Sequence, residues 1–261
     1  RDESPADHFA LDLDRAGLIS WYANPALGWT VLEENETTML VRNPDGATTR
    51  VAKRGAGGVE HVAYAVTDRE SWERLARPNL CVLDPGRIPF ARYAETRRAC
   101  AAARRHFSND AFGPFEMMHR LVGHETLLAA MALDPAWVKD MATTYCEFNI
   151  RHWDELFRAE GLPQSTWLAE DLGFKGKPFM SRAMFEAILL PGYARMFRWL
   201  HDHGLKVIVH SCGYVAPFVP LLRDAGMDCL EGMECKAGMD LPAIFKSMGD
   251  CLVWCGNIDI R

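Results

Sequence analysis

His210 and Cys212 are the pair of residues most suggestive of chemistry, because they stand two positions apart directly after an almost purely apolar run, residues 205–209. On an extended chain, residues i and i+2 point to the same side. Imidazole nitrogen and thiolate sulfur together suit Zn²⁺, and a catalytic zinc takes three protein ligands and keeps one position open. The pair therefore indicates a metal site that needs another ligand, although such a pair can also arise by chance. Candidates at neighbouring strand ends are Glu234, Cys235 and Cys255.

Further polar residues occur where the sequence predicts that strands end. In a closed barrel and in an open parallel sheet, the carboxyl ends of the strands meet at the site, so these side chains should converge. A single acid or amide at such a place is more simply explained as the cap of the next helix. The repetition over successive strands argues against that explanation for the whole set. The residues are Asn109, Asp110, Glu170, Asp171, Glu234, Asn257 and Asp259.

The elements that must position these residues alternate between strands and helices after about residue 100. Apolar, strand-forming runs occupy residues 105–109, 165–169, 205–209, 227–233 and 251–255. Between them lie helical patterns, three of which begin with a capping residue at Asp134, Ser181 and Asp240. Such alternation with buried strands is typical of parallel βα units. We therefore predict an α/β protein in which residues 101–261 form parallel βα units, arranged as a barrel or as an open sheet.

Residues 1–100 show a different pattern. Two strand-forming runs, residues 37–42 and 47–51, flank the sequence Asn43-Pro44-Asp45-Gly46. Pro presets φ and Gly accepts positive φ, so this segment predicts a tight turn between antiparallel strands. We expect an N-terminal extension that contains a β-hairpin and packs on the barrel. It could form a lid over the barrel mouth or the arm of a homodimer.

Composition excludes several classes of protein. The chain has 261 residues, 49 % of them hydrophobic, and a formal net charge of −6. That excludes intrinsic disorder; no apolar run is long enough for a membrane-spanning helix, and no basic stripe predicts nucleic-acid binding. Eight cysteines without a visible export signal predict reduced thiols in the cytoplasm. Glycine-rich nucleotide-binding motifs and a Gly-x-Ser-x-Gly elbow are both missing from the sequence.

The chain resembles the uroporphyrinogen decarboxylase superfamily over most of residues 105–261. The matching motifs are Gly-Pro-Phe-Glu at 113–116, Glu-Asp-Leu-Gly-Phe-Lys at 170–175, Pro-Phe-Met-Ser at 178–181, Gly-Leu-Lys-Val-Ile-Val-His-Ser-Cys-Gly at 204–213, Glu-Cys-Lys-Ala-Gly-Met-Asp at 234–240 and Gly-Asn-Ile-Asp-Ile-Arg at 256–261. This resemblance implies a TIM-type (βα)₈ barrel. The superfamily includes the decarboxylase itself and zinc-dependent methyltransferases that take methyl groups from methyl-corrinoid proteins.

The resemblance implies, first, a methyltransferase that moves a methyl group between a corrinoid protein and a thiol or similar small-molecule acceptor. Its zinc ligands are a His-x-Cys pair, which His210 and Cys212 match, and a distant carboxyl-terminal Cys, which would fall beyond Arg261. The neighbouring acids would contact the substrate or support the metal ligands, and the remaining polar residues would make peripheral substrate contacts. The expected catalytic residues are Glu170, Asp171 and Glu234, and the expected peripheral ones are Asn109, Asn257 and Asp259.

Two alternatives stay open. Uroporphyrinogen decarboxylase acts in porphyrin biosynthesis without a cofactor and holds its substrate through an arginine-rich amino-terminal segment, of a type that we do not find in this sequence. The third hypothesis is a non-catalytic barrel that binds a corrinoid protein. The intact pair of His210 and Cys212 tells against it.

Length adds one more expectation. A (βα)₈ barrel alone takes about 250 residues, yet the βα alternation begins only near residue 100 of 261. We therefore expect only five or six barrel strands in this chain. The closing βα units would lie in a carboxyl-terminal segment that the sequence does not include, and that segment could carry the third zinc ligand.

Overall fold

A six-stranded parallel sheet forms the centre of the computed structural model, which describes residue 8, residues 11–53 and residues 59–257. Its strands lie in the order β1-β6-β7-β10-β11-β12. They are β1 (Leu13–Ala16), β6 (His106–Phe112), β7 (Ser165–Ala169), β10 (Lys206–Ser211), β11 (Cys229–Gly232) and β12 (Val253–Gly256). The predicted α/β class is confirmed, and the described strands form part of a TIM-type barrel.

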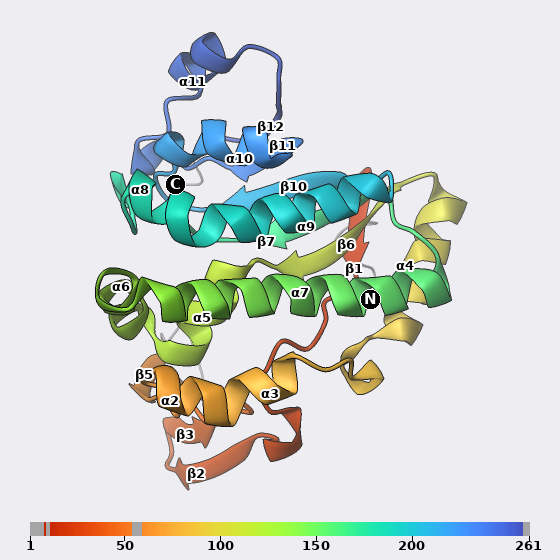
Figure 1. Ribbon diagram of the computed structural model, residues 1–261. Helices are drawn as coiled ribbons and strands as arrows, with labels where there is room; N and C mark the ends of the chain where they lie inside the picture. Colours follow the sequence, from red (N-terminus) through yellow and green to blue (C-terminus); the bar gives the residue numbers. More distant parts are fainter. Residues whose placement is uncertain (1–7, 9–10, 54–58, 258–261) are drawn as a thin grey trace.

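Helices cover one side of this sheet, and Figure 1 shows α7, α9 and α10 side by side across the strands. The longer helices are α4 (Phe90–Ala103), α5 (Pro114–Val122), α6 (His124–Leu133), α7 (Pro135–Glu160), α9 (Leu190–Asp202), α10 (Val219–Ala225) and α11 (Leu241–Met248). The shorter ones are η1 (Pro25–Leu27), α2 (Arg69–Ser71), η2 (Trp72–Ala76), α3 (Arg77–Leu80), η3 (Pro85–Arg87), α8 (Arg182–Met184), η4 (Phe185–Leu189), η5 (Ala216–Phe218) and η6 (Cys235–Ala237).

The three predicted helix caps are confirmed. Asp134 accepts a hydrogen bond from the N–H of Trp137, Ser181 from that of Met184 and Asp240 from that of Ala243. Each cap satisfies an N–H group that the first turn of a helix leaves without a partner.

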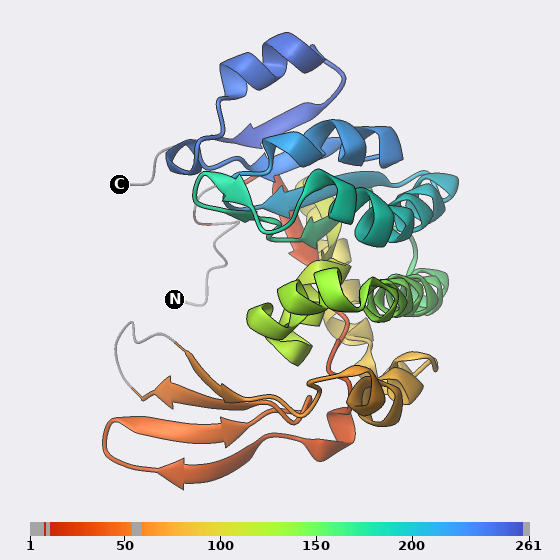
Figure 2. The same ribbon diagram turned by 60° about the vertical axis from the view of Figure 1, so that its left-hand side comes forward.

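A four-stranded antiparallel sheet lies at one end of the molecule, in orange in Figure 2. Its strands are β2 (Thr30–Glu34), β3 (Thr38–Arg42), β4 (Thr48–Ala52) and β5 (Glu60–Ala63). The predicted hairpin is the β3–β4 pair, and Asn43 closes its turn by accepting the N–H groups of Asp45 and Ala47. The turn is largely buried, and Asp45 accepts the N–H of Ala23 at 2.5 Å.

Assigning the whole of residues 1–100 to an extension was wrong in one respect. Strand β1 pairs in parallel with β6, so a barrel strand precedes the antiparallel sheet in the chain. This strand has only four residues, two of them charged, and its sequence therefore lacks the apolar run that marks the other strands.

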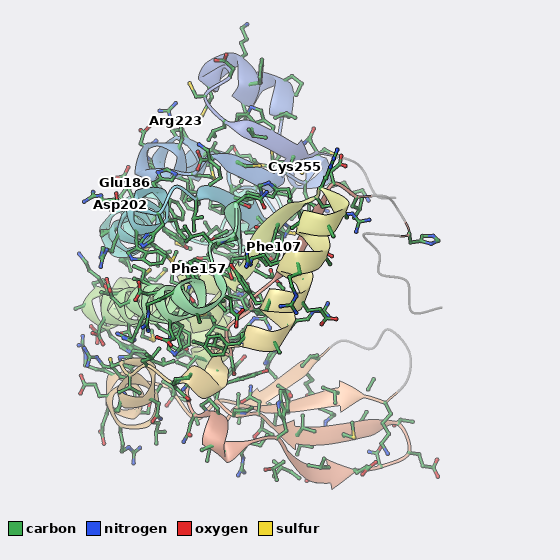
Figure 3. All side chains as sticks on the ribbon, turned by 90° about the vertical axis from the view of Figure 1, so that its right-hand side faces the viewer. Phe107, Phe157, Glu186, Asp202, Arg223 and Cys255 are labelled. Carbon is green, nitrogen blue, oxygen red and sulfur yellow. The ribbon has the colours of Figure 1, made fainter. Side chains whose placement is uncertain are left out.

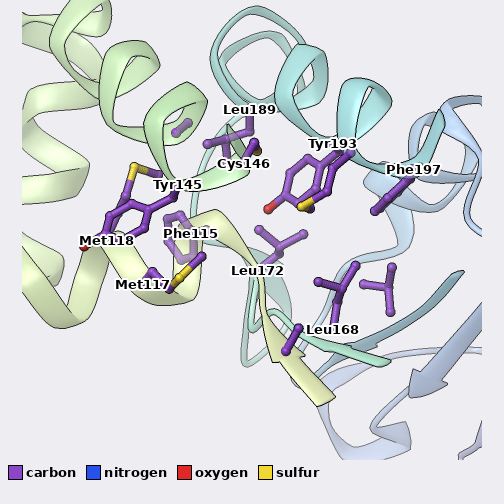
Figure 4. Packing of buried hydrophobic residues seen from close by; sticks show 14 of the residues in the cluster. Phe115, Met117, Met118, Tyr145, Cys146, Leu168, Leu172, Leu189, Tyr193 and Phe197 are labelled. Atoms are coloured by element: carbon purple, nitrogen blue, oxygen red, sulfur yellow. The ribbon is translucent and has the colours of Figure 1, made fainter. Parts of the chain in front are cut away.

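The main core lies between the parallel sheet and its helices. Alternate strand residues point to opposite sides of a sheet. One set, which includes Phe107, Leu168 and Val207, is buried against the helices. Figure 4 shows Leu168 packed near Leu172, Tyr193 and Phe197. In Figure 3, Phe107 and Phe157 lie within this layer, whereas Glu186, Asp202 and Arg223 lie on its outer side.

The other set of strand residues forms what we call the inner side of the sheet. It includes Arg15, Ser108, Asp110, Ser165, Trp167, His210, Glu231 and Cys255. No helix in the described part of the chain is both long enough and apolar enough to cross a lipid bilayer.

Candidate metal centre

Asp171, His210 and Cys212 come together at the carboxyl ends of two adjacent strands, β7 and β10. The Sγ atom of Cys212 lies 3.3 Å from Nε2 of His210, and an Asp171 carboxylate oxygen lies 3.5 Å from that same nitrogen. Ligand atoms of all three residues lie within 4.8 Å of one another. Within the described residues, they form the one group of three or more His, Cys, Asp and Glu side chains with this spacing.

The donor set and its spacing fit a metal ion. A tetrahedral Zn²⁺ with bonds of about 2.3 Å to sulfur and about 2.0 Å to nitrogen holds these two atoms about 3.5 Å apart. Three protein ligands leave one position for a substrate, as in catalytic zinc sites. Of the three half-buried ligands, Cys212 lines a pocket of about 310 Å³, so an incoming group could reach the open position from that side.

His210 is held by a second carboxylate. Its Nδ1 atom is hydrogen-bonded to Glu231 on the neighbouring strand β11, which directs Nε2 towards Cys212. Burial alone would lower the pKa of His210, but the hydrogen bond and charge of Glu231, with the charge of Asp171, outweigh burial and raise it. A carboxylate on the far ring nitrogen is the usual support of a metal-binding histidine, because it fixes the tautomer and the ring orientation.

The backbone around Cys212 is held by the neighbouring acids. Asp171 accepts the N–H of Cys212 at 2.8 Å, and Glu234 accepts that of Gly213 at 2.8 Å. Burial, with the charges of Asp171 and Glu234, raises the pKa of the Cys212 thiol to about 12. A nearby cation would be needed to ionise this thiol at neutral pH, and a coordinated metal does that.

A short hairpin borders the pocket. Strands β8 (Gly173–Phe174) and β9 (Lys177–Pro178) pair with each other, and the N–H of Tyr214 donates to the carbonyl of Phe174. A Cβ atom on Gly173 would lie only 2.7 Å from the Cys212 carbonyl oxygen, so glycine allows this close approach. The pocket lining also includes Lys175 and Lys236, and it includes no arginine among the described residues.

Glu170 lies on the opposite, helix-facing side from Asp171, although we expected both residues at the site. It is completely buried, and its carboxylate accepts the N–H groups of Phe115 and Glu116 at the start of α5, both at 2.9 Å. The hydroxyl of Tyr193 donates to it as well. Burial raises the pKa of Glu170 well above its ordinary value, while the two N–H groups oppose that shift. Glu170 is therefore a cap for a neighbouring helix.

The remaining predicted residues that the structure describes lie outside the cluster. Strand β6 continues to Phe112, so the prediction that it ends at Asn109 was wrong, and Asn109 is buried within it on the helix-facing side. Asn257 donates to the carbonyls of Met233 and Met239 and thereby ties the end of β12 to the loop after β11. Asp259 lies outside the described residues. Cys235 and Cys255, both exposed, do not join the cluster.

Two site residues were missed in the sequence. Glu231 is one of two carboxylates inside the predicted strand 227–233. Trp167 lies inside the predicted strand 165–169, and the centroid of its ring is 5.2 Å from that of His210. The alternation of side chains along a strand could have placed both residues on the same side as His210. Pairing between strands, which the sequence does not reveal, decides which of them are neighbours.

Comparisons with known proteins agree with this fold. The family model described as uroporphyrinogen decarboxylase (URO-D) matches residues 57–260. Among solved structures, a methyltransferase from Methanosarcina mazei is similar with a TM-score of 0.60 and 15 % identity, over 97 % of this chain and 67 % of that one. No curated protein sequence matches significantly. Because the family match extends over most of the sequence, the chain belongs to the uroporphyrinogen decarboxylase (URO-D) family.

Proposed function

We propose that this protein is a zinc-dependent methyltransferase that transfers a methyl group from a methyl-corrinoid protein to a small thiol or similar acceptor. The observation that carries the proposal is the arrangement around His210, with Glu231 on one ring nitrogen and Cys212 with Asp171 near the other. The fold likeness to a methyltransferase from Methanosarcina mazei supports the same class of reaction.

In this proposal Asp171, His210 and Cys212 hold the zinc ion. Bound zinc would lower the pKa of the acceptor thiol, so that a thiolate is available near neutral pH. In the reaction, a sulfur–carbon bond forms as the carbon–cobalt bond breaks; the electron pair of that bond stays on cobalt, and the thiol proton is released. Glu231 keeps Nε2 of His210 directed at the site, and Glu234 holds the Gly213 turn in place.

The decarboxylase alternative receives less support from the site. Binding of a tetrapyrrole's carboxylates calls for arginines around the pocket, whereas its described lining offers two lysines and no arginine. The non-catalytic alternative, a barrel that only binds a corrinoid protein, would give no reason for a carboxylate-supported histidine beside a thiol.

Metal analysis of the purified chain tests the proposal. We expect about one zinc per chain after loading and dialysis, and loss of that zinc in His210→Ala and in Cys212→Ala. Cys235→Ala is the matched control, since this exposed thiol lies in the neighbouring loop but outside the cluster. A folded wild-type chain that holds no stoichiometric zinc would contradict the proposal, as would turnover of uroporphyrinogen by metal-free protein.

A further inference from the structure

A belt of charged and aromatic side chains crosses the inner side of the parallel sheet and ends at the candidate metal centre. Five neighbouring strands contribute one residue each, and these are Arg15 of β1, Asp110 of β6, Trp167 of β7, His210 of β10 and Glu231 of β11. The register aligns Asp110 with Trp167, and His210 with Glu231. Strand pairing thus places one of these side chains on each of five neighbouring strands of the six-stranded sheet.

Trp167 is the middle member of this belt, and it contacts Arg15 on one side and His210 on the other. The guanidinium carbon of Arg15 lies 3.6 Å from the centroid of the Trp167 ring. On the side of β10, the ring centroids of Trp167 and His210 are 5.2 Å apart, and the angle between the ring planes is 32°. That separation is typical of aromatic rings in contact.

Arg15 lies between this ring and the Asp110 carboxylate. Its Nη1 atom is buried and has no hydrogen-bond partner among the described residues, and the Asp110 carboxylate lies 3.6 Å from it, beyond hydrogen-bond distance. Beside this ion pair, the guanidinium lies over the Trp167 face, which is a cation–π interaction. Arg15 thus covers one face of the Trp167 ring.

We infer that Trp167 is a positioning residue for the metal centre, and that it acts through the ring of His210. This inference rests on the proposed function, since it concerns the metal that His210 would bind. Glu231 fixes one edge of the imidazole by a hydrogen bond, and Trp167 restricts rotation of the ring by packing near it. A metal-bound imidazole carries partial positive charge, so contact with an aromatic face favours the loaded state.

Titration with Co²⁺, followed by its visible absorption and by tryptophan fluorescence, tests this inference on the full chain. In Trp167→Leu we expect Co²⁺ affinity to fall by about tenfold or more, the range found when supports of metal ligands are removed. Trp167→Phe keeps an aromatic ring against His210 and should retain most of the affinity. It should also remove the largest part of the fluorescence quenching that Co²⁺ causes in the wild type, because quenching is strongest for the tryptophan beside the ion.

Trp199→Leu is the matched control, because Trp199 also packs on a histidine, His203, at 4.1 Å, but lies on α9 outside the site. It should leave Co²⁺ affinity unchanged. If Trp167→Leu does not fold, Trp167→Met repeats the test with a flexible apolar side chain. Unchanged affinity in the folded Leu or Met variant would overturn the inference while leaving the metal site intact. A wild-type chain that binds no Co²⁺ would instead contradict the proposed function.

Discussion

The two sides of the parallel sheet use the same strands for different purposes. On the helix-facing side, apolar residues such as Leu168 and Val207 are buried, and the one carboxylate at the end of β7, Glu170, is fully satisfied by α5 and Tyr193. On the inner side, Trp167, His210 and Glu231 form a polar layer that is only partly buried. The adjacent residues Glu170 and Asp171 therefore differ in surroundings: Glu170 caps α5, and Asp171 belongs to the candidate metal centre.

This difference shows that position at a strand end does not by itself assign a residue to a site. The direction of the side chain decides, because neighbouring residues on a strand point to opposite sides. Substitutions on the helix-facing side should change the free energy of unfolding, and substitutions on the inner side should change ligand affinity. The predictions for Glu170, Asp171 and Asn109 test that separation, and Asp45 serves as a comparison from the antiparallel sheet.

The largest expected effect is that of Glu170→Ala. The substitution leaves two N–H groups of α5 and the hydroxyl of Tyr193 buried without an acceptor. We expect the free energy of unfolding to fall by about 3–5 kcal/mol in urea denaturation, and less in Glu170→Gln, which keeps an acceptor oxygen. Zinc affinity of the remaining folded protein should not change. Normal stability with loss of zinc would place Glu170 at the site.

Asp45, in the turn between β3 and β4, tests whether burial raises the pKa of an acid that lies outside the site. Burial raises the pKa of Asp45 from 3.8 to about 6 in the folded chain, despite the N–H of Ala23 and the charges of two arginines, which lower it. The folded state therefore keeps its proton where the unfolded state has lost it, and stability contributed by Asp45 falls as pH rises from about 4 to about 6.

The expected size of this effect is about 2–3 kcal/mol. The measurement is the difference in free energy of unfolding between the wild type and Asp45→Asn at several pH values. The free energy of unfolding of the wild type should fall relative to that of Asp45→Asn between about pH 4 and about pH 6. Above about pH 7 the difference between them should stay constant. A difference that does not depend on pH would show that Asp45 is ionised throughout this range.

On the inner side, Asp171→Asn should weaken zinc binding by about tenfold or more, because it removes a charged ligand. The amide oxygen can still accept the N–H of Cys212, so the free energy of unfolding should change little. Glu234→Gln is the control, since Glu234 holds the adjacent turn without joining the cluster. Isothermal titration with zinc measures both variants. Equal affinities for the two would remove Asp171 from the ligand set.

Asn109→Leu should have the smallest effect. The amide is fully buried on the helix-facing side, and neither its oxygen nor its nitrogen has a hydrogen-bond partner in the described part of the chain. Replacement by an apolar residue of similar size should change the free energy of unfolding by no more than about 1 kcal/mol. Catalytic turnover should stay the same. A marked rise in KM would instead indicate that Asn109 contacts the substrate, as predicted from the sequence.

Much of the fold was predictable from local signals. The caps at Asp134, Ser181 and Asp240 and the turn at Asn43–Gly46 act over a few residues, so the sequence contains the whole signal. Strand β1 was not predictable in this way, because a short charged strand becomes part of the sheet only by pairing with β6, about ninety positions later.

The candidate site, too, was predictable only where its residues lie close together in the sequence. His210 and Cys212 are two positions apart at the end of one strand, so their spacing was informative. Glu231 and Trp167 belong to neighbouring strands, and only the register brings them to His210. The surroundings of Glu170 were not predictable, because its partners are two N–H groups more than fifty residues earlier in α5 and the Tyr193 hydroxyl on α9, and no local pattern reveals them.

X-ray absorption spectroscopy of the zinc-loaded protein tests the central claim most directly, because it counts the ligands by element. The account predicts one sulfur at about 2.3 Å and nitrogen or oxygen ligands at about 2.0–2.2 Å, with an imidazole signature. In Cys212→Ala the sulfur contribution should disappear. Two or more sulfur ligands, or a zinc environment without sulfur in the wild-type chain, would contradict a centre built from Asp171, His210 and Cys212.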